Sequence, residues 1–204
     1  MRLKDFVNAN IKPGKGKIVF VGARPAVGKT SFVLSCAEIL SLEGRNILYF
    51  DLENSLTDRL NGSKIPNCKI VTDECIDAVL IREKCVAERD KANLIVIIDY
   101  LQLVDRLDGS LFDVQKELRS IADEQQVTII VTSQLPGIID NRDDKRPNEN
   151  DMELLSLDKN MYNNLIFLYR PAYYDSNADR RKIYVIADGV ENEMIWDEDG
   201  LSVE

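Results

Sequence analysis

The sequence contains no histidine, and this absence removes several classes of site from consideration. Without histidine there is no Ser-His-Asp or Cys-His nucleophile arrangement and no histidine general base, so proton transfer must fall to carboxylates. The four cysteines are not spaced as C-x-x-C pairs, and no histidine is available to complete a common zinc site. We therefore expect no metal cluster held by these residue types.

Long apolar runs are also missing from the sequence. No run approaches the roughly 20 residues that a membrane-spanning helix needs. The N-terminal stretch MRLKDFVNANIKPGKG has neither the apolar segment nor the small-residue cleavage site of a secretory signal. We therefore expect a cytoplasmic protein that does not cross a membrane.

Positive charge is in the minority, with 26 Lys and Arg against 35 Asp and Glu, for a net charge of -9. Binding to duplex nucleic acid is driven largely by lysine and arginine that neutralise phosphates. The balance therefore argues against a broad basic surface, although it is compatible with a local basic loop.

The 204 residues suffice for one well-packed domain and are too few to favour two large ones. Short apolar runs rich in β-formers alternate with segments of helical period, which is typical of βα units around a buried parallel sheet. We therefore predict a single α/β domain over residues 1–204, with a mostly parallel central sheet flanked by helices and antiparallel strands toward the C-terminus.

The same patterns give the expected positions of the elements. Strands are predicted at Lys17–Gly22, Asn46–Asp51, near Lys69–Thr72, Leu94–Asp99, Val127–Ser133, Leu165–Tyr169, Lys182–Ala187 and Glu193–Trp196. Helices are predicted after the first strand with a stop at Gly44, from about Ile76 to Arg89, and from Phe112 to Gln126. The polar, proline-bearing stretch from Pro136 to Asp151 predicts a long mobile loop.

A P-loop pattern, GARPAVGKT, runs from Gly22 to Thr30 between a predicted strand and a predicted helix. Backbone N–H groups of such a loop cradle phosphate oxygens, Lys29 reaches the β and γ phosphates, and the Thr30 hydroxyl binds magnesium. Ala23 replaces the first glycine of the pattern, which is acceptable if its φ is negative. The residues predicted to bind nucleotide are Ala23, Arg24, Pro25, Ala26, Val27, Gly28, Lys29, Thr30 and Ser31.

Polar residues that follow predicted strands are the further candidates for chemistry. Asp99 ends an apolar strand, where its carboxylate would face a ligand beyond the sheet and contact magnesium together with Thr30. Glu53 is placed to orient and deprotonate an attacking water, and Asp51 is the competing candidate. Gln134 is placed to sense the γ-phosphate. Each residue also has a purely structural explanation: Asp99 could open a turn, Glu53 could stand at the start of a helix, where acidic residues are favoured, and Gln134 could be the polar end of a strand.

The polar stretch after Gln134 carries a small basic cluster of Arg142, Lys145 and Arg146. These side chains are candidates for contact with a nucleic-acid backbone. Three aspartates at positions 140, 143 and 144 nearly cancel their charge, so a solvated loop is an equally good interpretation.

Three motifs in order, GARPAVGKTSF, IIDYLQLV and TSQL, resemble the motor domain of the DnaB-type replicative helicases. Further matches are DLEN, ELRSIADEQQ, DKRP and IFLYR, so that the resemblance covers roughly Ile11 to Ala187. It implies a RecA-like core that binds ATP and Mg²⁺. By position it also implies the roles already suggested for the P-loop, Glu53, Asp99 and Gln134, and a polar loop that lines the channel of a ring and contacts single-stranded DNA.

Two departures limit what the resemblance implies. The family's N-terminal domain has no counterpart in this sequence. The family also carries a Lys-x-Arg finger that enters the neighbouring subunit's ATP site, and here Asp188 and Val190 stand at or near those places. Loss of such a finger is worth roughly 10³ to 10⁵ in rate, so hydrolysis is expected to be slow unless Arg180, Arg181 or Lys182 substitutes.

Two functional hypotheses follow from these observations. The first is a DnaB-like ATPase that forms a homo-oligomeric ring or filament on single-stranded DNA and couples ATP hydrolysis to movement or unwinding, with replication or mobile-element proteins as partners. The second is a reduced family member that binds ATP as a conformational switch, does not unwind DNA and acts through a protein partner. A RecA-like ATPase outside replication is a third option.

Overall fold

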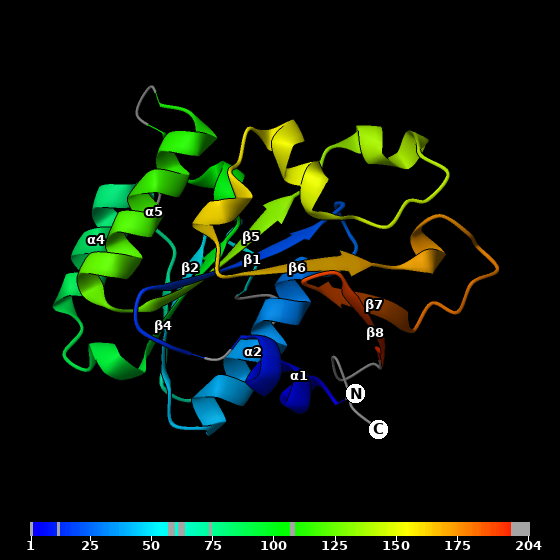
Figure 1. Ribbon diagram of the computed structural model, residues 1–204. Coiled ribbons are helices and arrows are strands. Elements are labelled where there is room, and N and C mark those ends of the chain that lie inside the picture. Colours follow the sequence, from blue (N-terminus) through cyan, green and yellow to red (C-terminus); the bar gives the residue numbers. More distant parts are fainter. Residues whose placement is uncertain are drawn as a thin grey trace.

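The computed structural model describes residues 2–11, 13–56, 60, 64–73, 75–106 and 109–196. Its centre is a sheet of eight described strands in the order β3-β2-β4-β5-β1-β6-β7-β8 (Figure 1). Neighbours from β3 to β6 run parallel, and β7 and β8 are antiparallel. The strands are β1 (Lys17–Ala23), β2 (Asn46–Asp51), β3 (Cys68–Val71), β4 (Leu94–Asp99), β5 (Thr128–Gln134), β6 (Asn164–Tyr169), β7 (Lys182–Ala187) and β8 (Val190–Ile195). This arrangement confirms the predicted fold class.

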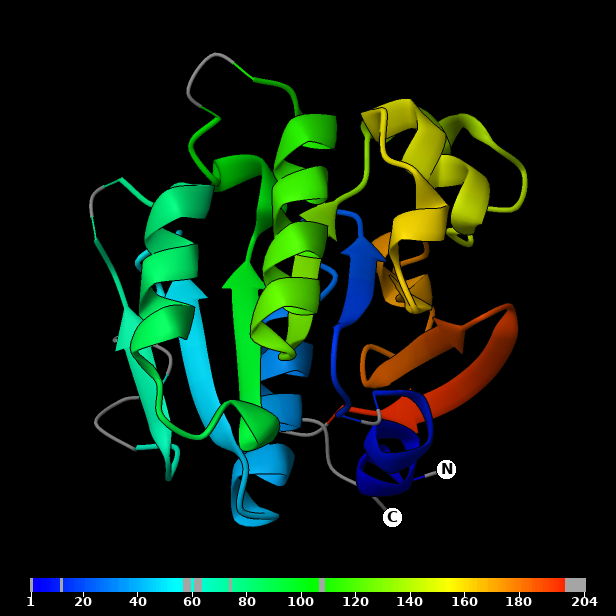
Figure 2. The same ribbon diagram turned by 60° about the vertical axis from the view of Figure 1, so that its left-hand side comes forward.

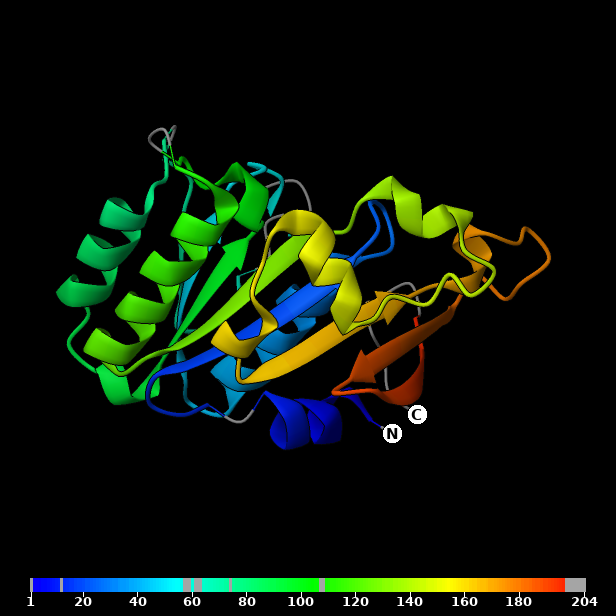
Figure 3. The same ribbon diagram turned by 45° about the horizontal axis from the view of Figure 1, so that its top comes forward.

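Helices cover both faces of the sheet, as Figures 2 and 3 show. One pair lies in front of the sheet in Figure 2 and consists of α4 (Ala78–Ala87) and α5 (Leu111–Gln125). The opposite face is covered by α2 (Lys29–Leu42), with α1 (Leu3–Asn10) packed against it. Among the described residues, no helix is long and apolar enough to cross a membrane.

Alternation along the central strands explains why the sheet is covered on both sides. In β1, Val19 and Val21 belong to the apolar cluster that includes α1 and α2, whereas Ile18 and Phe20 belong to the cluster that includes α4 and α5. All four side chains are fully buried. Because successive strand side chains point to opposite faces, a strand that is apolar at every position must lie between two layers.

The end of α2 confirms the predicted stop at Gly44. Gly44 has φ 86°, the left-handed conformation that favours glycine after a helix. Its N–H donates to the carbonyl of Ser41 (2.9 Å), and the N–H of Arg45 donates to the carbonyl of Leu40 (3.0 Å). These two bonds satisfy carbonyls in the last turn and release the chain toward β2.

The stretch predicted as a long loop from Pro136 to Asp151 is wrong in part, because it contains the 3-10 helix η3 (Gly137–Asn141) and the start of η4 (Glu149–Leu155). The polar residues that suggested a loop are the ones that order it. At the start of η4, Asn148 and Asp151 form a reciprocal capping box. The other short 3-10 helices are η1 (Lys91–Asn93), η2 (Leu101–Leu103), η5 (Lys159–Met161) and η6 (Pro171–Tyr173).

Candidate functional site

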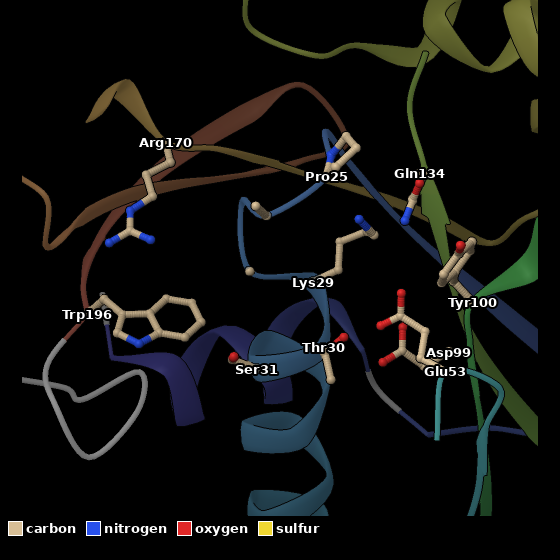
Figure 4. Close-up of a pocket in the computed structure, with 12 residues that line it drawn as sticks. Pro25, Lys29, Thr30, Ser31, Glu53, Asp99, Tyr100, Gln134, Arg170 and Trp196 are labelled. Atoms are coloured by element: carbon tan, nitrogen blue, oxygen red, sulfur yellow. The ribbon is translucent and has the colours of Figure 1, made fainter. Parts of the chain in front are cut away.

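The candidate site lies at the carboxyl edge of the parallel strands, where a cavity of about 620 Å³ opens between the P-loop and the ends of β2, β4 and β5. Strand register brings the predicted residues there: Asp51 pairs with Asp99, and Ala23 pairs with Gln134. The side chains around this cavity appear in Figure 4. Its lining consists of Pro25, Ala26, Gly28, Lys29, Thr30, Ser31, Glu53, Asp99, Tyr100, Gln134, Arg170 and Trp196.

The backbone of the P-loop explains which positions need glycine. Gly28 has φ 117° and precedes the first residue of α2, so a side chain there would be strained. Ala23 is the last residue of β1, and its φ is not positive. The expectation that alanine is acceptable in place of the first glycine is therefore confirmed. Ala26, with φ 59°, is the P-loop residue that adopts a left-handed conformation without being glycine.

The cavity is lined by six of the nine residues predicted to bind nucleotide, and Ala23, Arg24 and Val27 are the three that do not line it. Ala23 and Val27 are buried in the core beneath the loop. The Arg24 guanidinium turns away from the cavity and pairs with Asp140, with 2.8 Å between Nη2 and Oδ2. The loop's sequence could not reveal this direction, because it depends on a residue 116 positions away.

Lys29 is a buried cation at the centre of the site. Its residue is 7% exposed, and burial lowers the pKa of its ammonium to about 8, against the attraction of Asp99 and Glu53. In Figure 4 its side chain extends toward Gln134 and the acidic side of the cavity. An ammonium that is buried in this way is stabilised by an anion, which the phosphates of a nucleotide would provide.

Asp99 is held rigidly at the end of β4. The Tyr49 hydroxyl donates to its Oδ2 (2.9 Å), and the Thr132 hydroxyl donates to its Oδ1 (2.6 Å). Burial and the neighbouring Asp99 raise the pKa of Tyr49 well above its ordinary value, so the phenol stays protonated as a donor. Each carboxylate oxygen keeps a lone pair for a further contact. The site therefore offers a fixed acidic oxygen in the cavity that the Thr30 hydroxyl also lines.

The described part of the chain contains no group of three His, Cys, Asp or Glu side chains arranged to hold a metal ion by themselves. Magnesium in phosphate-transfer sites is usually bound by one or two carboxylates or hydroxyls together with substrate phosphates. Thr30 and Asp99 both line the cavity and are the right donors for that mode of binding.

Glu53 and Asp51 differ sharply in their surroundings. Asp51 is 1% exposed, and its Oδ2 accepts the backbone N–H of Leu56 (2.8 Å), so it organises the chain after β2. Glu53 is exposed and lines the cavity, which Asp51 does not. In Figure 4 the Glu53 and Asp99 side chains both lie on the same side of the cavity as Gln134. The geometry therefore favours Glu53 over Asp51 as the group that meets a ligand.

Gln134 lines the cavity from the end of β5, and a second glutamine that we did not predict fixes its backbone. Gln102, in η2, donates through Nε2 to the carbonyl of Gln134 (2.8 Å) and to the Ser133 hydroxyl (2.9 Å). Its Oε1 accepts the N–H of Gln134 (3.2 Å). The position of Gln102 three residues after Asp99 was the available signal, since it lies on the same sheet edge.

Three more lining residues were not predicted as parts of the site: Tyr100, Arg170 and Trp196. Figure 4 shows Arg170 and Trp196 on the side of the P-loop away from Asp99 and Gln134. The ring of Trp196 packs on Gly28, because a Cβ added there would lie 3.0 Å from it. Arg170 comes from the end of β6 and Trp196 follows β8, so only the folded sheet brings them to the P-loop.

The three basic residues of the 136–151 stretch lie outside the cavity and contact neighbours within the chain. Arg142 pairs with the buried Asp151 (2.7 Å between Nη1 and Oδ1). Lys145 donates to the carbonyl of Arg142 (3.0 Å). Arg146 pairs with Glu191 (2.8 Å between Nε and Oε2). All three therefore help to order the stretch, whatever else they bind.

The two residues at or near the places that the resemblance gives to the finger lie where β7 joins β8: Asp188 is in the turn, and Val190 is the first residue of β8. Asp188 and Gly189 have φ of 46° and 82°, so they make a tight turn, and β8 starts three residues earlier than predicted. The Asp188 carboxylate accepts hydrogen bonds from the N–H of Leu165 (3.0 Å) and from Nδ2 of Asn164 (2.9 Å). Asp188 therefore holds the start of β6 within its own chain.

Comparison with known families and proteins agrees with this geometry. The family described as the DnaB-like helicase C terminal domain matches residues 56–195. The replicative DNA helicase DnaC of Bacillus subtilis is 28% identical over 213 residues, covering 84% of this chain and 47% of that protein. The replicative DNA helicase DnaB of Geobacillus stearothermophilus is 24% identical with the same coverage. The chain thus spans about half the length of these relatives.

Two solved structures show the same fold. One, described as an ATPase domain, superimposes with a TM-score of 0.80 at 22% identity, covering 98% of this chain and 89% of that one. A DnaB-like replicative helicase, described together with its interactions with primase, gives a TM-score of 0.75 at 23% identity, covering 91% of this chain and 56% of that one. The RecA-like architecture expected from the sequence is therefore confirmed.

Proposed function

The chain belongs to the family of DnaB-like helicase C-terminal domains, and we propose from this premise that it is an ATP-dependent motor domain that acts on single-stranded DNA in replication. The observation that carries the proposal is the cavity in which Lys29, Thr30, Glu53, Asp99 and Gln134 meet. The reaction it supports is the hydrolysis of ATP to ADP and phosphate.

The P-loop end of the cavity supports phosphate binding. Backbone N–H groups at the start of α2 and the Lys29 ammonium would bind the β and γ phosphates. The negative phosphates would stabilise the buried ammonium. Thr30 and Asp99 would hold the magnesium ion, Thr30 through its hydroxyl and Asp99 through its carboxylate. Bound magnesium neutralises the charge that develops on the phosphate oxygens.

Glu53 is the group that we assign to water activation. It is exposed to the cavity beside Asp99, and a carboxylate is the proton acceptor available in a chain without histidine. Gln134 lines the cavity and would contact the γ-phosphate through its amide. Gln102 holds the backbone of Gln134, and with it the end of β5, in a fixed position. Loss of the γ-phosphate would then change the position of Gln134 and of the residues that follow β5.

Arg170 and Trp196 are suited to the base and ribose of the nucleotide. They line the part of the cavity opposite Glu53 and Asp99, and an aromatic ring and a guanidinium both stack on a flat base. Trp196 is the only tryptophan in the sequence, so its fluorescence reports on occupancy of this site without labelling.

Hydrolysis is proposed to be slow in an isolated assembly of this chain. By resemblance, Asp188 and Val190 stand at or near the finger positions, and the Asp188 carboxylate accepts the N–H of Leu165 in its own chain. Arg180 and Arg181 are exposed side chains that could approach a neighbouring site instead, although Arg181 pairs with Asp179 (3.5 Å) and Lys182 pairs with Glu193 (2.9 Å). Removal of such an arginine from other P-loop enzymes costs about 10³-fold or more in rate.

The proposed partners are single-stranded DNA and further copies of the chain in a ring or filament, together with replication or mobile-element proteins. The stretch from 136 to 151, with Arg142, Lys145 and Arg146, is the candidate DNA contact, because Arg142 and Arg146 keep 34% and 45% of their side chains exposed. Arginine has five donors, so Arg146, which pairs with Asp144 and Glu191, keeps N–H groups that can donate to a phosphate.

The test is steady-state ATP hydrolysis with and without single-stranded DNA, on the wild type, Lys29→Ala and Lys4→Ala. Lys4 is an exposed lysine on α1, so its variant controls for loss of charge away from the site. We expect DNA to stimulate turnover about tenfold or more. This activity should vanish in Lys29→Ala and persist in Lys4→Ala. ATP binding with negligible turnover that DNA does not change would refute the motor and support a conformational switch.

A further inference from the structure

Arg24 of the P-loop connects the nucleotide site to the stretch that follows β5. Its guanidinium donates from Nε and Nη2 to Asp140 in η3 (3.0 and 2.8 Å) and from Nη1 to the carbonyl of Leu135 (2.6 Å). The approach is close, because a Cβ at Gly137 would lie 3.3 Å from Nη2. Both edges of the planar guanidinium are therefore used, which fixes η3 relative to the loop.

Asp140 joins a third segment to the same point. The hydroxyl of Tyr174, just after η6, donates to Oδ1 of Asp140 (2.8 Å). The chain that leads from β6 to Tyr174 contains Arg170, which lines the nucleotide cavity. Two segments that contribute residues to the cavity, the P-loop and the chain that follows β6, thus meet at one carboxylate.

Two basic residues of the 136–151 stretch lie over tyrosine rings, one of which is that of Tyr174. The Lys145 ammonium lies 5.8 Å from the ring centre of Tyr174, and the Arg146 guanidinium lies 5.1 Å from that of Tyr169. The rings of Tyr169 and Tyr174 stack on each other with centroids 5.8 Å apart. A movement of Asp140 together with the P-loop would therefore be passed to Lys145 and Arg146.

The stability of the fold gives little reason for this pair. The side chains of Arg24 and Asp140 are 13% and 32% exposed, so solvent partly screens the pair, and its contribution to stability is smaller than that of a pair with a fully buried carboxylate. A bidentate arginine–carboxylate pair instead fixes the orientation and the separation of the two segments that it joins. Arg24 thus turns its long side chain away from the nucleotide and uses it for a contact that sets the position of η3.

We propose that the Arg24–Asp140 pair is a positioning element that transmits nucleotide binding at the P-loop to residues 137–146. This rests on the proposed function, since it takes the cavity to bind a nucleotide. When a nucleotide occupies the P-loop, Arg24 shifts with the loop. Arg24 moves η3 through its bonds to Asp140, and the movement reaches Lys145 through Tyr174.

The experiment is hydrogen exchange of residues 137–146, measured by mass spectrometry with and without magnesium and a slowly hydrolysed ATP analogue. Trp196 fluorescence measures nucleotide affinity in the same samples. In the wild type we expect the analogue to slow exchange in 137–146 about fivefold or more. In Asp140→Asn the analogue should bind within about threefold of wild type and should change exchange less than twofold.

The matched control is Asp144→Asn, a carboxylate on the same stretch whose described partner is Arg146. It should keep the full nucleotide response. If Asp140→Asn does not fold, Tyr174→Phe removes one hydroxyl from the same carboxylate and should reduce the response by about half.

A full response in both Asp140→Asn and Tyr174→Phe, or no response in a wild type whose Trp196 reports bound nucleotide, would overturn the proposal. A wild type that does not bind the analogue at all, by fluorescence and by calorimetry, would refute the proposed function and this inference with it. The two failures are therefore distinguished by the fluorescence signal.

Discussion

Lys29 at the P-loop and Arg146 beside β8 are two cations whose surroundings shift their pKa in opposite directions. At the P-loop, burial lowers the pKa of Lys29 to about 8, and the attraction of Asp99 and Glu53 does not outweigh it. Beside β8, the hydrogen bond with Glu191 raises the pKa of Arg146 above its ordinary value. Lys29 is therefore a cation that gains from an incoming anion, whereas Arg146 already has one. The first arrangement is typical of a binding site, and the second orders a surface segment.

The acidic residues at the same sheet edge allow the sharpest test of this comparison. We expect Glu53→Gln to lower the rate of ATP hydrolysis about 10²-fold or more with nucleotide affinity little changed, because it removes the proton acceptor and keeps the shape. Asp51→Asn should instead lower stability with a smaller effect on rate, since Asp51 holds the N–H of Leu56. Single-turnover hydrolysis and urea unfolding separate the two effects, and equal loss of rate in both variants would contradict the assignment.

On the other side of the sheet, Arg142→Ala should lower the free energy of unfolding by about 2 kcal/mol, because it leaves the Asp151 carboxylate buried without its guanidinium. The control is Lys159→Ala, which removes an exposed ion pair with Glu149 and should cost less than about 1 kcal/mol. Urea unfolding monitored by circular dichroism measures both. Similar small losses would show that Arg142 is held loosely and is free to bind DNA.

The pH dependence of nucleotide affinity tests the Lys29 side of the comparison. Below pH 8 the free site already carries the charged ammonium, so affinity should be constant. Bound phosphates favour the charged form, so above pH 8 binding takes up a proton and affinity should fall, up to about tenfold per pH unit. Titrations of Trp196 fluorescence from about pH 7 to about pH 9.5 measure this fall. A Lys29→Arg variant stays charged and should show a flat profile, and an equally flat wild type would contradict the lowered pKa.

The smallest expected effect concerns the base-proximal wall of the cavity. Trp196→Leu keeps an apolar contact with Gly28 but removes the aromatic face, so nucleotide affinity should fall about fivefold with the turnover rate little changed. Calorimetry is the measurement here, because the variant has lost the fluorescent probe. A variant that binds as tightly as the wild type would show that the base does not lie against this ring.

Much of the fold was predictable because its strands are apolar on both faces. The run from Leu94 to Asp99 is buried at every position, and its bounds were predicted without error. Prediction was less accurate for 136–151, where proline and many charges suggested a mobile loop. Charges indicate a loop when they are solvated, but Arg142 and Asp151 pair with each other, and no local pattern encodes that pairing.

The sequence by itself determined the P-loop end of the cavity. The residues from Gly22 to Thr30 are contiguous, and their loop geometry is set by local backbone preferences that travel with the chain. Asp99 and Gln134 were also predictable, since the ends of parallel strands meet at one edge. Only the tertiary structure decided what surrounds this end. Trp196 packs on Gly28, and Arg24 turns from the cavity to a carboxylate 116 positions later, because contacts between distant segments depend on how the strands are ordered in the sheet.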